Sequence, residues 1–206
     1  MWPGVGETVR APDWLPTEDC GNGLHGWLYG QGDHSCSSYL DDTAVWLVLE
    51  VVSDTIVMLG GKCKFPECVV RFVGDRNSAT QFLRENEPRA REVAVIGASM
   101  HAGDRESAVV GALGTATAGD GGTATAGNSG TATAGDDGTA TAGYRGTATA
   151  GNRGTATAGD GGTICLRWWD ASAERYRTEV AYVGEGGIEA NVAYRLSADH
   201  KFVRAE

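Results

Sequence analysis

Two cysteines and two histidines near the N-terminus are the first residues whose types could carry chemistry. Cys20, His25, His34 and Cys36 supply two thiols and two imidazoles within 17 residues. Zinc takes four such ligands in a tetrahedron. The spacing contains no Cys-x-x-Cys pair, and Gly-rich intervals would have to fold the ligands together. We interpret this stretch as a Gly-rich loop with buried thiols and ordinary surface imidazoles, and predict no metal and no cofactor.

A second cysteine pair, Cys63 and Cys68, could form a redox pair or half of a metal site. Pro66 between them instead favours the bend of a hairpin. The chain holds five cysteines, and the odd number favours free thiols over a disulfide framework.

Acidic residues recur between the strands of a repeat described below and could coordinate calcium. Calcium-binding β-rolls place an Asp at one fixed slot of every copy. Here that slot also holds Asn128, Tyr144 and Asn152. We therefore interpret the acids as turn residues, since Asp and Asn tolerate turn conformations. They are Asp120, Asp136, Asp137 and Asp160.

Hydroxyl groups are the most regularly spaced polar groups of the chain. Residues 114–161 are six tandem copies of Gly-Thr-Ala-Thr-Ala-Gly-x-x. The Thr-Ala alternation has period two, which predicts a strand with Thr on one face and Ala on the other. Ala is small and apolar, so the Ala face should be the inside of a β-solenoid.

The register extends beyond the perfect copies, through residues 98–113 and 162–169, to nine units in all. Their inward slots hold Met100, Val110, Ile164 and Leu166, larger residues of the kind that a terminal coil needs. A coil could contain two units in a flat, two-sheet arrangement or three in a triangle. An Ala-lined triangle would enclose a void, so we favour two eight-residue units per coil.

The outward threonines of the repeat are the candidate binding surface. If coils hold two units, they form a grid of hydroxyls and methyls on each of two faces, able to order a sheet of water. One face carries Thr115, Thr117, Thr131, Thr133, Thr147 and Thr149. The other carries Thr123, Thr125, Thr139, Thr141, Thr155 and Thr157.

The flanks complete a mainly β chain. Residues 1–97 are predicted to be a small α+β domain, with strands at 44–52, 55–59 and 68–73 and a helix at 77–86. Residues 98–169 form the solenoid, and residues 170–206 a C-terminal β-hairpin cap. In that cap, 175–183 should pair with 188–196 across a Gly-rich turn, followed by a short strand near Phe202.

Charge and composition limit the partners. The net charge is −10, which argues against nucleic acid or an anionic membrane as partner. There is no apolar run of about 18 residues, as a membrane span needs. The start, Met1 to Gly4, lacks a basic and then apolar leader, which predicts a cytoplasmic location.

The Thr-x-Thr-Ala-Gly core and the possible 16-residue double unit resemble the coils of bacterial ice-nucleation and Thr-ladder ice-binding proteins. This resemblance covers the repeat only, where the usual Ser and Gln slots are absent. It implies a β-solenoid that binds ice or ordered water.

The flanks resemble uncharacterised bacterial and phage-associated proteins, which implies no activity. The matching stretches are Cys20-Gly-Asn-Gly-Leu-His25-Gly-Trp27, Leu59-Gly-Gly-Lys-Cys63, Arg167-Trp-Trp-Asp170 and Tyr182-Val-Gly-Glu-Gly186.

His25-Gly26 followed by Tyr39 is similar to ADP-ribosyltransferases. In that family a His-Gly pair and a later Tyr bracket a nicotinamide, and a distal Glu orients the ribose. No Glu here stands in a recognisable Glu motif, so the resemblance implies an inactive domain.

Three functions follow, in this order. The first is a non-enzymatic scaffold that presents its Thr faces or variable turns to a macromolecular partner, such as a protein. The second is binding of ice or ordered water. The third is the transferase-like N-terminal domain. The short array and the absence of a leader place the first ahead of the second.

Overall fold

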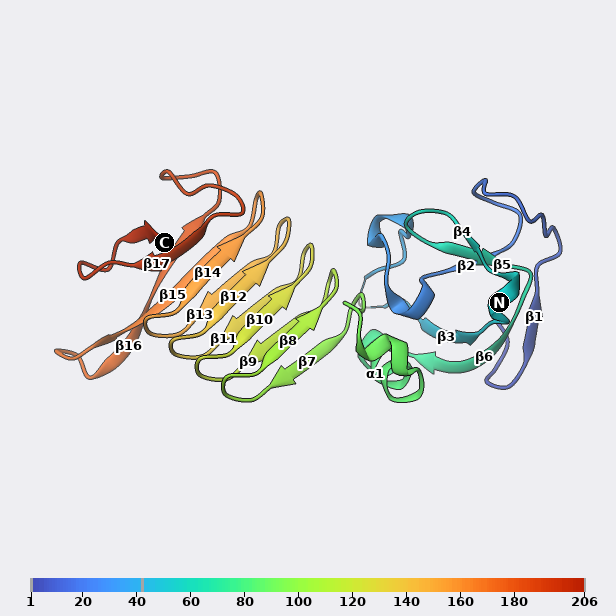
Figure 1. Cartoon of the computed structure of the whole chain (residues 1–206), viewed down its shortest axis with the longest axis horizontal. Coiled ribbons are helices and arrows are strands. Elements are labelled where there is room, and N and C mark those ends of the chain that lie inside the picture. The colour runs from blue at the N-terminus through green and yellow to red at the C-terminus, as the bar shows by residue number, and fades with distance from the viewer. Residues whose placement is uncertain (1, 42, 206) are drawn as a thin grey trace. The chain divides into compact units, whose positions relative to one another are not determined.

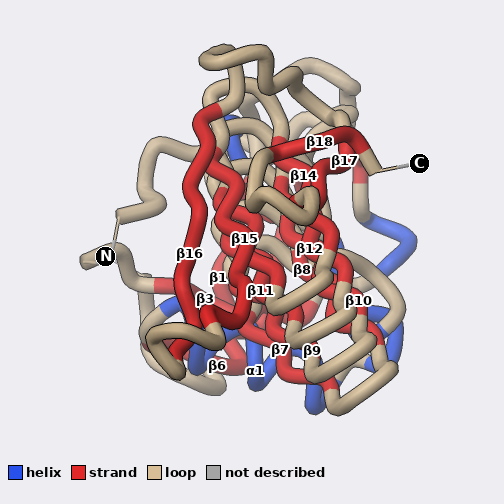
Figure 2. Tube along the Cα trace, turned by 90° about the vertical axis from the view of Figure 1, so that its left-hand side faces the viewer, coloured by secondary structure: helices blue, strands red, loops and turns tan. Residues whose placement is uncertain are grey.

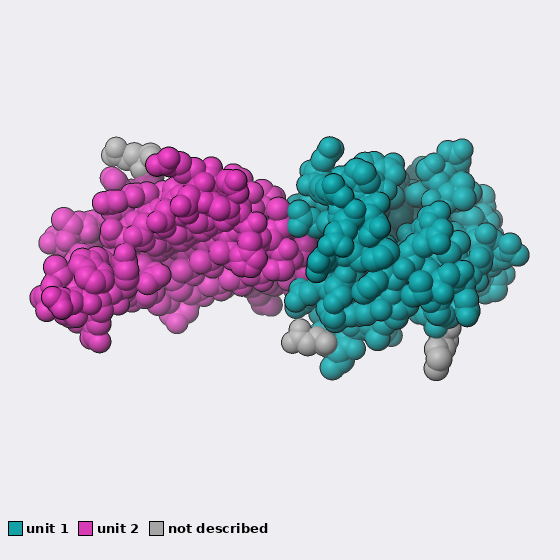
Figure 3. All heavy atoms as spheres, turned by 90° about the horizontal axis from the view of Figure 1, so that it is seen from below, with its two compact units in different colours: residues 1–96 teal, residues 97–206 magenta. Residues whose placement is uncertain are grey.

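The computed structural model describes residues 2–41 and 43–205, which divide into two compact units. Unit 1 comprises residues 1–96 and unit 2 residues 97–206 (Figure 3). Each unit has its own buried residues, and each is considered by itself below.

Unit 1 contains two three-stranded antiparallel sheets. Its strands are β1 (Thr8–Arg10), β2 (Leu24–Gly26), β3 (Trp46–Glu50), β4 (Val57–Met58), β5 (Cys63–Phe65) and β6 (Glu67–Gly74). One sheet has the order β1-β6-β3 and the other β2-β5-β4. Cys63, Phe65 and Cys68 form a buried cluster, against which partly buried residues such as Leu24 and Leu49 pack.

The predicted helix of unit 1 is confirmed as α1 (Arg76–Asn86). It begins where the Asp75 carboxylate accepts a hydrogen bond from the Ser78 backbone N–H at 2.9 Å, the usual role of an N-cap Asp. Four short 3₁₀ helices complete the unit: η1 (Leu28–Gly30), η2 (His34–Cys36), η3 (Ser53–Thr55) and η4 (Pro88–Arg91). Among the described residues, no helix has the length and apolar character to cross a bilayer.

Two details of unit 1 differ from the sequence-based prediction. The strand expected at 44–52 is confined to β3 and is only partly buried, because its residues border a cavity. Pro66 does not bend a hairpin. It separates β5 from β6, which belong to different sheets, and Pro suits such a corner because it has no N–H to donate to a strand ladder.

Unit 2 is built on a two-sheet β-solenoid (Figure 1). Its nine strands are β7 (Ser99–Ala102), β8 (Ser107–Val110), β9 (Thr115–Ala118), β10 (Thr123–Ala126), β11 (Thr131–Ala134), β12 (Thr139–Ala142), β13 (Thr147–Ala150), β14 (Thr155–Ala158) and β15 (Thr163–Asp170). Alternate strands join the same parallel sheet, so Thr131 pairs with Thr115 and Thr147. The 16-residue register confirms two units per coil and excludes the triangular coil.

The alanines fill the interior, as the alternation predicts. Ala116, Ala132 and Ala148 are fully buried, and every Ala of the six Thr-Ala-Thr-Ala strands is at most 3% exposed. In the outer coils Val110, Ile164 and Leu166 are also buried, whereas Met100 is half-buried. The solenoid therefore has a thin apolar core between its two sheets.

The turns stack as regularly as the strands. In each variable pair the second residue has a left-handed backbone, for example φ 53° at Ser129 and 56° at Asp137. Glycine is required before the pair because the preceding coil approaches closely: a Cβ on Gly127 would lie 2.5 Å from the backbone N of Ala112. Asp120 accepts a hydrogen bond from the Asp136 N–H at 2.8 Å, one coil further on.

The C-terminal residues continue both sheets as antiparallel hairpins. They form β16 (Arg175–Tyr182), β17 (Ala193–Leu196) and β18 (Phe202–Arg204). Figure 2, seen from this end, shows β15 and β16 on one side and β14 and β17 on the other. The cap is confirmed, but the predicted pairing of 175–183 with 188–196 is wrong. β16 pairs along β15, and β17 joins β14 and β18, because the solenoid offers two open edges.

Candidate functional site

Two flat threonine faces are the candidate site of unit 2. We call the outer side of the β7-β9-β11-β13-β15-β16 sheet the β9 face, and that of the β8-β10-β12-β14-β17-β18 sheet the β10 face. As predicted for two-unit coils, the β9 face carries Thr115, Thr117, Thr131, Thr133, Thr147 and Thr149. The β10 face carries Thr123, Thr125, Thr139, Thr141, Thr155 and Thr157.

The strand pairing sets the spacing of this grid. Each Thr lies beside the Thr sixteen residues away, so successive rows are separated by the strand spacing of about 4.8 Å. The two Thr of one strand are separated by about 6.8 Å, twice the rise per residue. Each face thus presents a rectangular lattice of hydroxyls and methyls.

The hydroxyl rows extend beyond the threonines predicted from the perfect copies. Thr163 of β15 pairs with Thr147, and Ser99 of β7 pairs with Thr115, so the β9 face has a five-strand hydroxyl row. On the β10 face Ser107 pairs with Thr123. The sequence indicated the extension at Thr163, because the last unit still begins with Gly162-Thr163.

Charged side chains lie at the edges of the solenoid, in its turns. The Arg153 guanidinium contacts the Asp137 carboxylate at 2.5 Å, one coil away on the same edge. The pKa of Asp137 is lowered by this hydrogen bond and ion pair. The strand positions between the turns hold only Thr and Ala in the six perfect copies, so the two faces carry no formal charge there.

The same contacts make the faces rigid. Asp136 accepts from the Asn152 N–H at 2.8 Å, and Asn128 accepts from the Tyr144 N–H at 3.1 Å, so both edges are tied from coil to coil. Tyr176 of β16 donates to the Asp136 carboxylate at 3.1 Å. A surface held in this way does not have to be ordered when it binds, which lowers the entropic cost of binding.

The turn acids do not gather into a calcium shell. Asp120 and Asp136 use a carboxylate oxygen on backbone N–H groups, and Asp137 binds Arg153. Asp160 lies in the turn between β14 and β15, on the opposite edge from the other three. Asp120, Asp136 and Asp137 thus connect the turns of successive coils.

The Cys and His residues of unit 1 are likewise not assembled. Over residues 2–41 and 43–205, no three His, Cys, Asp or Glu side chains stand where they could share a metal ion. Cys20 and Cys36 are exposed, so the prediction of buried thiols in this loop is wrong. His25 accepts a hydrogen bond from the Gly21 N–H at 3.4 Å. Partial burial, with Lys62 and Lys64 nearby, lowers the pKa of His25.

Cys63 and Cys68 are buried thiols of the core. Burial raises the pKa of Cys63, and it raises the pKa of Cys68 to about 11. Both groups are therefore thiols near neutral pH, whereas redox exchange and metal binding need the thiolate.

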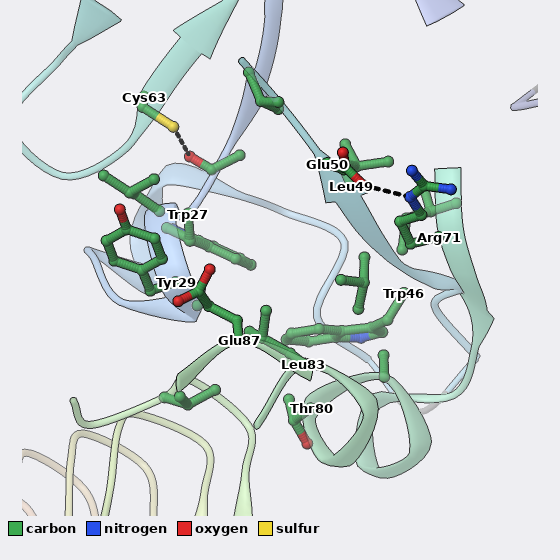
Figure 4. Close-up of a pocket in the computed structure, with 18 of the residues that line it drawn as sticks. Trp27, Tyr29, Trp46, Leu49, Glu50, Cys63, Arg71, Thr80, Leu83 and Glu87 are labelled. Atoms are coloured by element: carbon green, nitrogen blue, oxygen red, sulfur yellow. Dashed lines mark hydrogen bonds and ion pairs between the residues drawn. The ribbon is translucent and has the colours of Figure 1, made fainter. Parts of the chain in front are cut away.

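The two residues shared with ADP-ribosyltransferases border one cavity of unit 1. This cavity, part of whose lining is shown in Figure 4, has a volume of about 610 Å³. Both His25 and Tyr39 are among its lining residues. Tyr39, however, is 80% exposed, so its ring stands in solvent and is not packed across from His25. The arrangement does not show a nicotinamide site.

Unit 2 is therefore a Thr-ladder β-solenoid scaffold, and part of its sequence is similar to ice nucleation proteins. The chain is 38% identical over 90 residues to an ice nucleation protein of Xanthomonas campestris pv. translucens, covering 43% of this chain and 6% of the relative. It is 37% identical over 100 residues to one of Pseudomonas syringae pv. syringae, covering 47% and 8%. It is 38% identical over 85 residues to one of Pantoea ananas, covering 40% and 8%.

These relatives confirm that the repeat is of the ice-nucleation type. The chain spans less than a tenth of their length, so the similarity concerns a short stretch of much longer proteins. No protein-family model matches the chain, and no solved structure matches it.

The same relatives correct one prediction. The cytoplasmic location is wrong, because the chain is similar to ice nucleation proteins, which are not cytoplasmic proteins. That prediction rested on the first residues of the sequence, which do not determine the location of the protein.

Proposed function

We propose that unit 2 binds ice or ordered water through its threonine faces. The observation that carries this proposal is the register of the strands, which places twelve Thr side chains on two rectangular lattices. Each lattice point offers a hydroxyl that can hydrogen bond to water and a methyl that limits where that water can sit. Similarity to ice nucleation proteins supports the same function.

The chemistry of the faces favours water over a charged partner. An ordered layer of water needs many equivalent hydrogen-bond donors and acceptors at fixed spacing. Scattered charged groups would disturb such a layer, because each imposes a hydration geometry of its own. The faces meet this need, because the charged residues of the repeat lie in the turns and the grid between them is uncharged.

The size of the grid limits the strength of binding. Three perfect Thr-Thr strands cover about 10 Å of each face, and Ser99 and Thr163 extend one row of the β9 face to about 19 Å. A small template contacts a small area of crystal. We expect inhibition of ice recrystallisation at high protein concentration, and weak nucleation of freezing.

Thr133 in the centre of the β9 face allows a direct test. Thr133→Tyr places a large ring on the grid without touching the Ala core, and should reduce recrystallisation inhibition severalfold in a splat-cooling assay. Asp160→Tyr is a matched control, because Tyr144 already occupies the equivalent turn position one coil earlier. It adds the same ring away from both faces and should leave the activity unchanged.

Two results would reject the proposal. One is a folded wild type with no thermal hysteresis and no effect on recrystallisation. The other is equal loss of activity in Thr133→Tyr and Asp160→Tyr. Presentation of the faces or turns to a macromolecular partner would then be the function to pursue, with a pull-down from the native cell.

A further inference from the structure

The cavity of unit 1 has aromatic walls supplied by three separate segments. Trp27 and Tyr29 come from residues around η1, and Trp46 comes from β3; α1 borders the cavity on another side. The Trp27 and Trp46 rings lie 5.9 Å apart between centroids, tilted by 32°. With a volume of about 610 Å³, the cavity is within the range of small-molecule sites.

Most of the charge at this cavity is internally neutralised. The Glu50 carboxylate is paired with the Arg71 guanidinium at 2.5 Å, and Figure 4 shows both on the β3–β6 side. Glu87 is paired with Arg89 at 2.7 Å, and Arg89 also lies 4.4 Å from the centre of the Tyr29 ring. The lining therefore holds two carboxylates and two guanidiniums, which favours an occupant without net charge.

Glu87 differs from Glu50 in its position. Figure 4 shows its carboxylate between Tyr29 and Trp46, directed toward Trp27. It lies where α1 ends and η4 begins, so two helix termini fix its backbone. Its side chain is 26% exposed, which leaves it accessible to a molecule in the cavity.

The Glu87 carboxylate can accept one more hydrogen bond. Arg89 donates to it through its backbone N at 3.0 Å, its Nε at 2.7 Å and its Nη2 at 2.9 Å. A carboxylate has about four acceptor positions, so one is left. These hydrogen bonds lower the pKa of Glu87 to about 2, so the group is an acceptor and not a donor near neutral pH.

We propose that this cavity binds an uncharged, planar heteroaromatic ring that carries an amino group, of the kind found in an aminopurine base. The two indoles lie too close together, at 5.9 Å between centroids, for a ring to insert between them, so the ring stacks on the cavity side of the Trp27–Trp46 pair. Its amino group donates a hydrogen bond to Glu87. A bicyclic base suits the cavity better than a monocyclic one, because it covers more of the two indoles and base–aromatic stacking is a substantial source of affinity.

Two matched probes test the proposal on the intact wild-type chain. 9-Methyladenine has an amino group as its sole N–H donor, and 6,9-dimethylpurine replaces that group with a methyl of similar size. Hydrogen bonds to an ionised acceptor are stronger than neutral ones, so we expect 9-methyladenine to bind about tenfold more tightly in a calorimetric titration. 1-Methylcytosine, which has the same type of donor on one ring, should bind more weakly than 9-methyladenine.

Two Glu→Gln variants assign the effect to one carboxylate. Glu87→Gln should reduce the preference for 9-methyladenine over 6,9-dimethylpurine to less than about threefold. Glu50→Gln removes the same charge from the same cavity away from the ring site, and should retain the preference. Circular dichroism would confirm that both variants are folded.

Three outcomes would overturn the proposal. They are equal affinity of the wild type for the two purines, no saturable binding of 9-methyladenine, and tighter binding of 1-methylcytosine than of 9-methyladenine. All three are measured on the wild type, so the proposal remains testable even if Glu87→Gln does not fold.

Discussion

The thin alanine core makes a sharp prediction about Ala132. This residue is fully buried in β11, between Ala116 and Ala148 of the neighbouring coils. Ala132→Leu adds three carbon atoms to a core in which every neighbouring slot of the perfect copies is also Ala. The sheets cannot separate locally, because each Gly-x-x-Gly turn fixes the distance between them. We expect a loss of about 1–3 kcal/mol in the free energy of unfolding of unit 2.

The adjacent residue supplies the control. Thr133→Leu introduces the same side chain one position away, on the outer face, where substitutions usually change stability by less than about 0.5 kcal/mol. Urea unfolding followed by circular dichroism would measure both. For a unit of about 100 residues, each 1 kcal/mol corresponds to roughly 4–8 °C in Tm, so the two variants should separate clearly in calorimetry. A neutral Ala132→Leu beside a strongly destabilising Thr133→Leu would refute the assignment of inside and outside.

Four further predictions concern the turns, the cap and unit 1. Ser129 has φ 53°, so Ser129→Gly should stabilise unit 2 by about 0.5–1 kcal/mol in urea unfolding; a destabilised variant would contradict this. Deleting residues 170–206 exposes the edges of β14 and β15, and should cause aggregation in light scattering; a soluble monomer would show that the cap is dispensable. Iodoacetamide at pH 8 should label Cys20 and Cys36 in the native chain, and Cys63 and Cys68 only after unfolding. The pKa of Glu87 is about 2 against an ordinary 4.5, so its stabilising effect should be complete above pH 4.5 and fall as the pH approaches 2; a Glu87→Gln variant with the same acid sensitivity would disprove this.

The solenoid could be predicted because the residues that determine its fold recur in every copy of the repeat. Thr-Ala alternation gives the sidedness, the void argument gives two units per coil, and the Gly-x-x-Gly step gives the turns. The coil-to-coil hydrogen bonds of Asp120 and Asp136 were missed, although Asp at that slot was noticed. A side chain that accepts from a backbone N–H sixteen residues away is visible only when the register is known.

The flanking regions were harder to predict because their partners are distant in the chain. The eight residues of β15 could pair fully with the eight of β16, whereas a local hairpin of β16 with β17 would have left both solenoid edges open. The cavity of unit 1 likewise depends on Trp27, Trp46 and Glu87, which come together from an extended segment, a strand and a helix end. No local pattern around any of these three residues indicates that they share a site.

The outer coils show that the solenoid fold does not itself require threonine. His101, Val109 and Cys165 occupy outward slots of β7, β8 and β15 and pair in the same register as the threonines beside them. All twelve outward slots of the perfect copies are Thr, whereas the exposed turn pairs of the same copies vary from Asp-Gly to Tyr-Arg. Duplication of the repeat would make both sets alike, so it does not by itself explain the uniform Thr. The fold is determined by the inward Ala, the corner Gly and the stacked turns. We therefore attribute the twelve outward Thr residues to a requirement of the surface and not of the fold. This is expected for a lattice that must be uniform to order water.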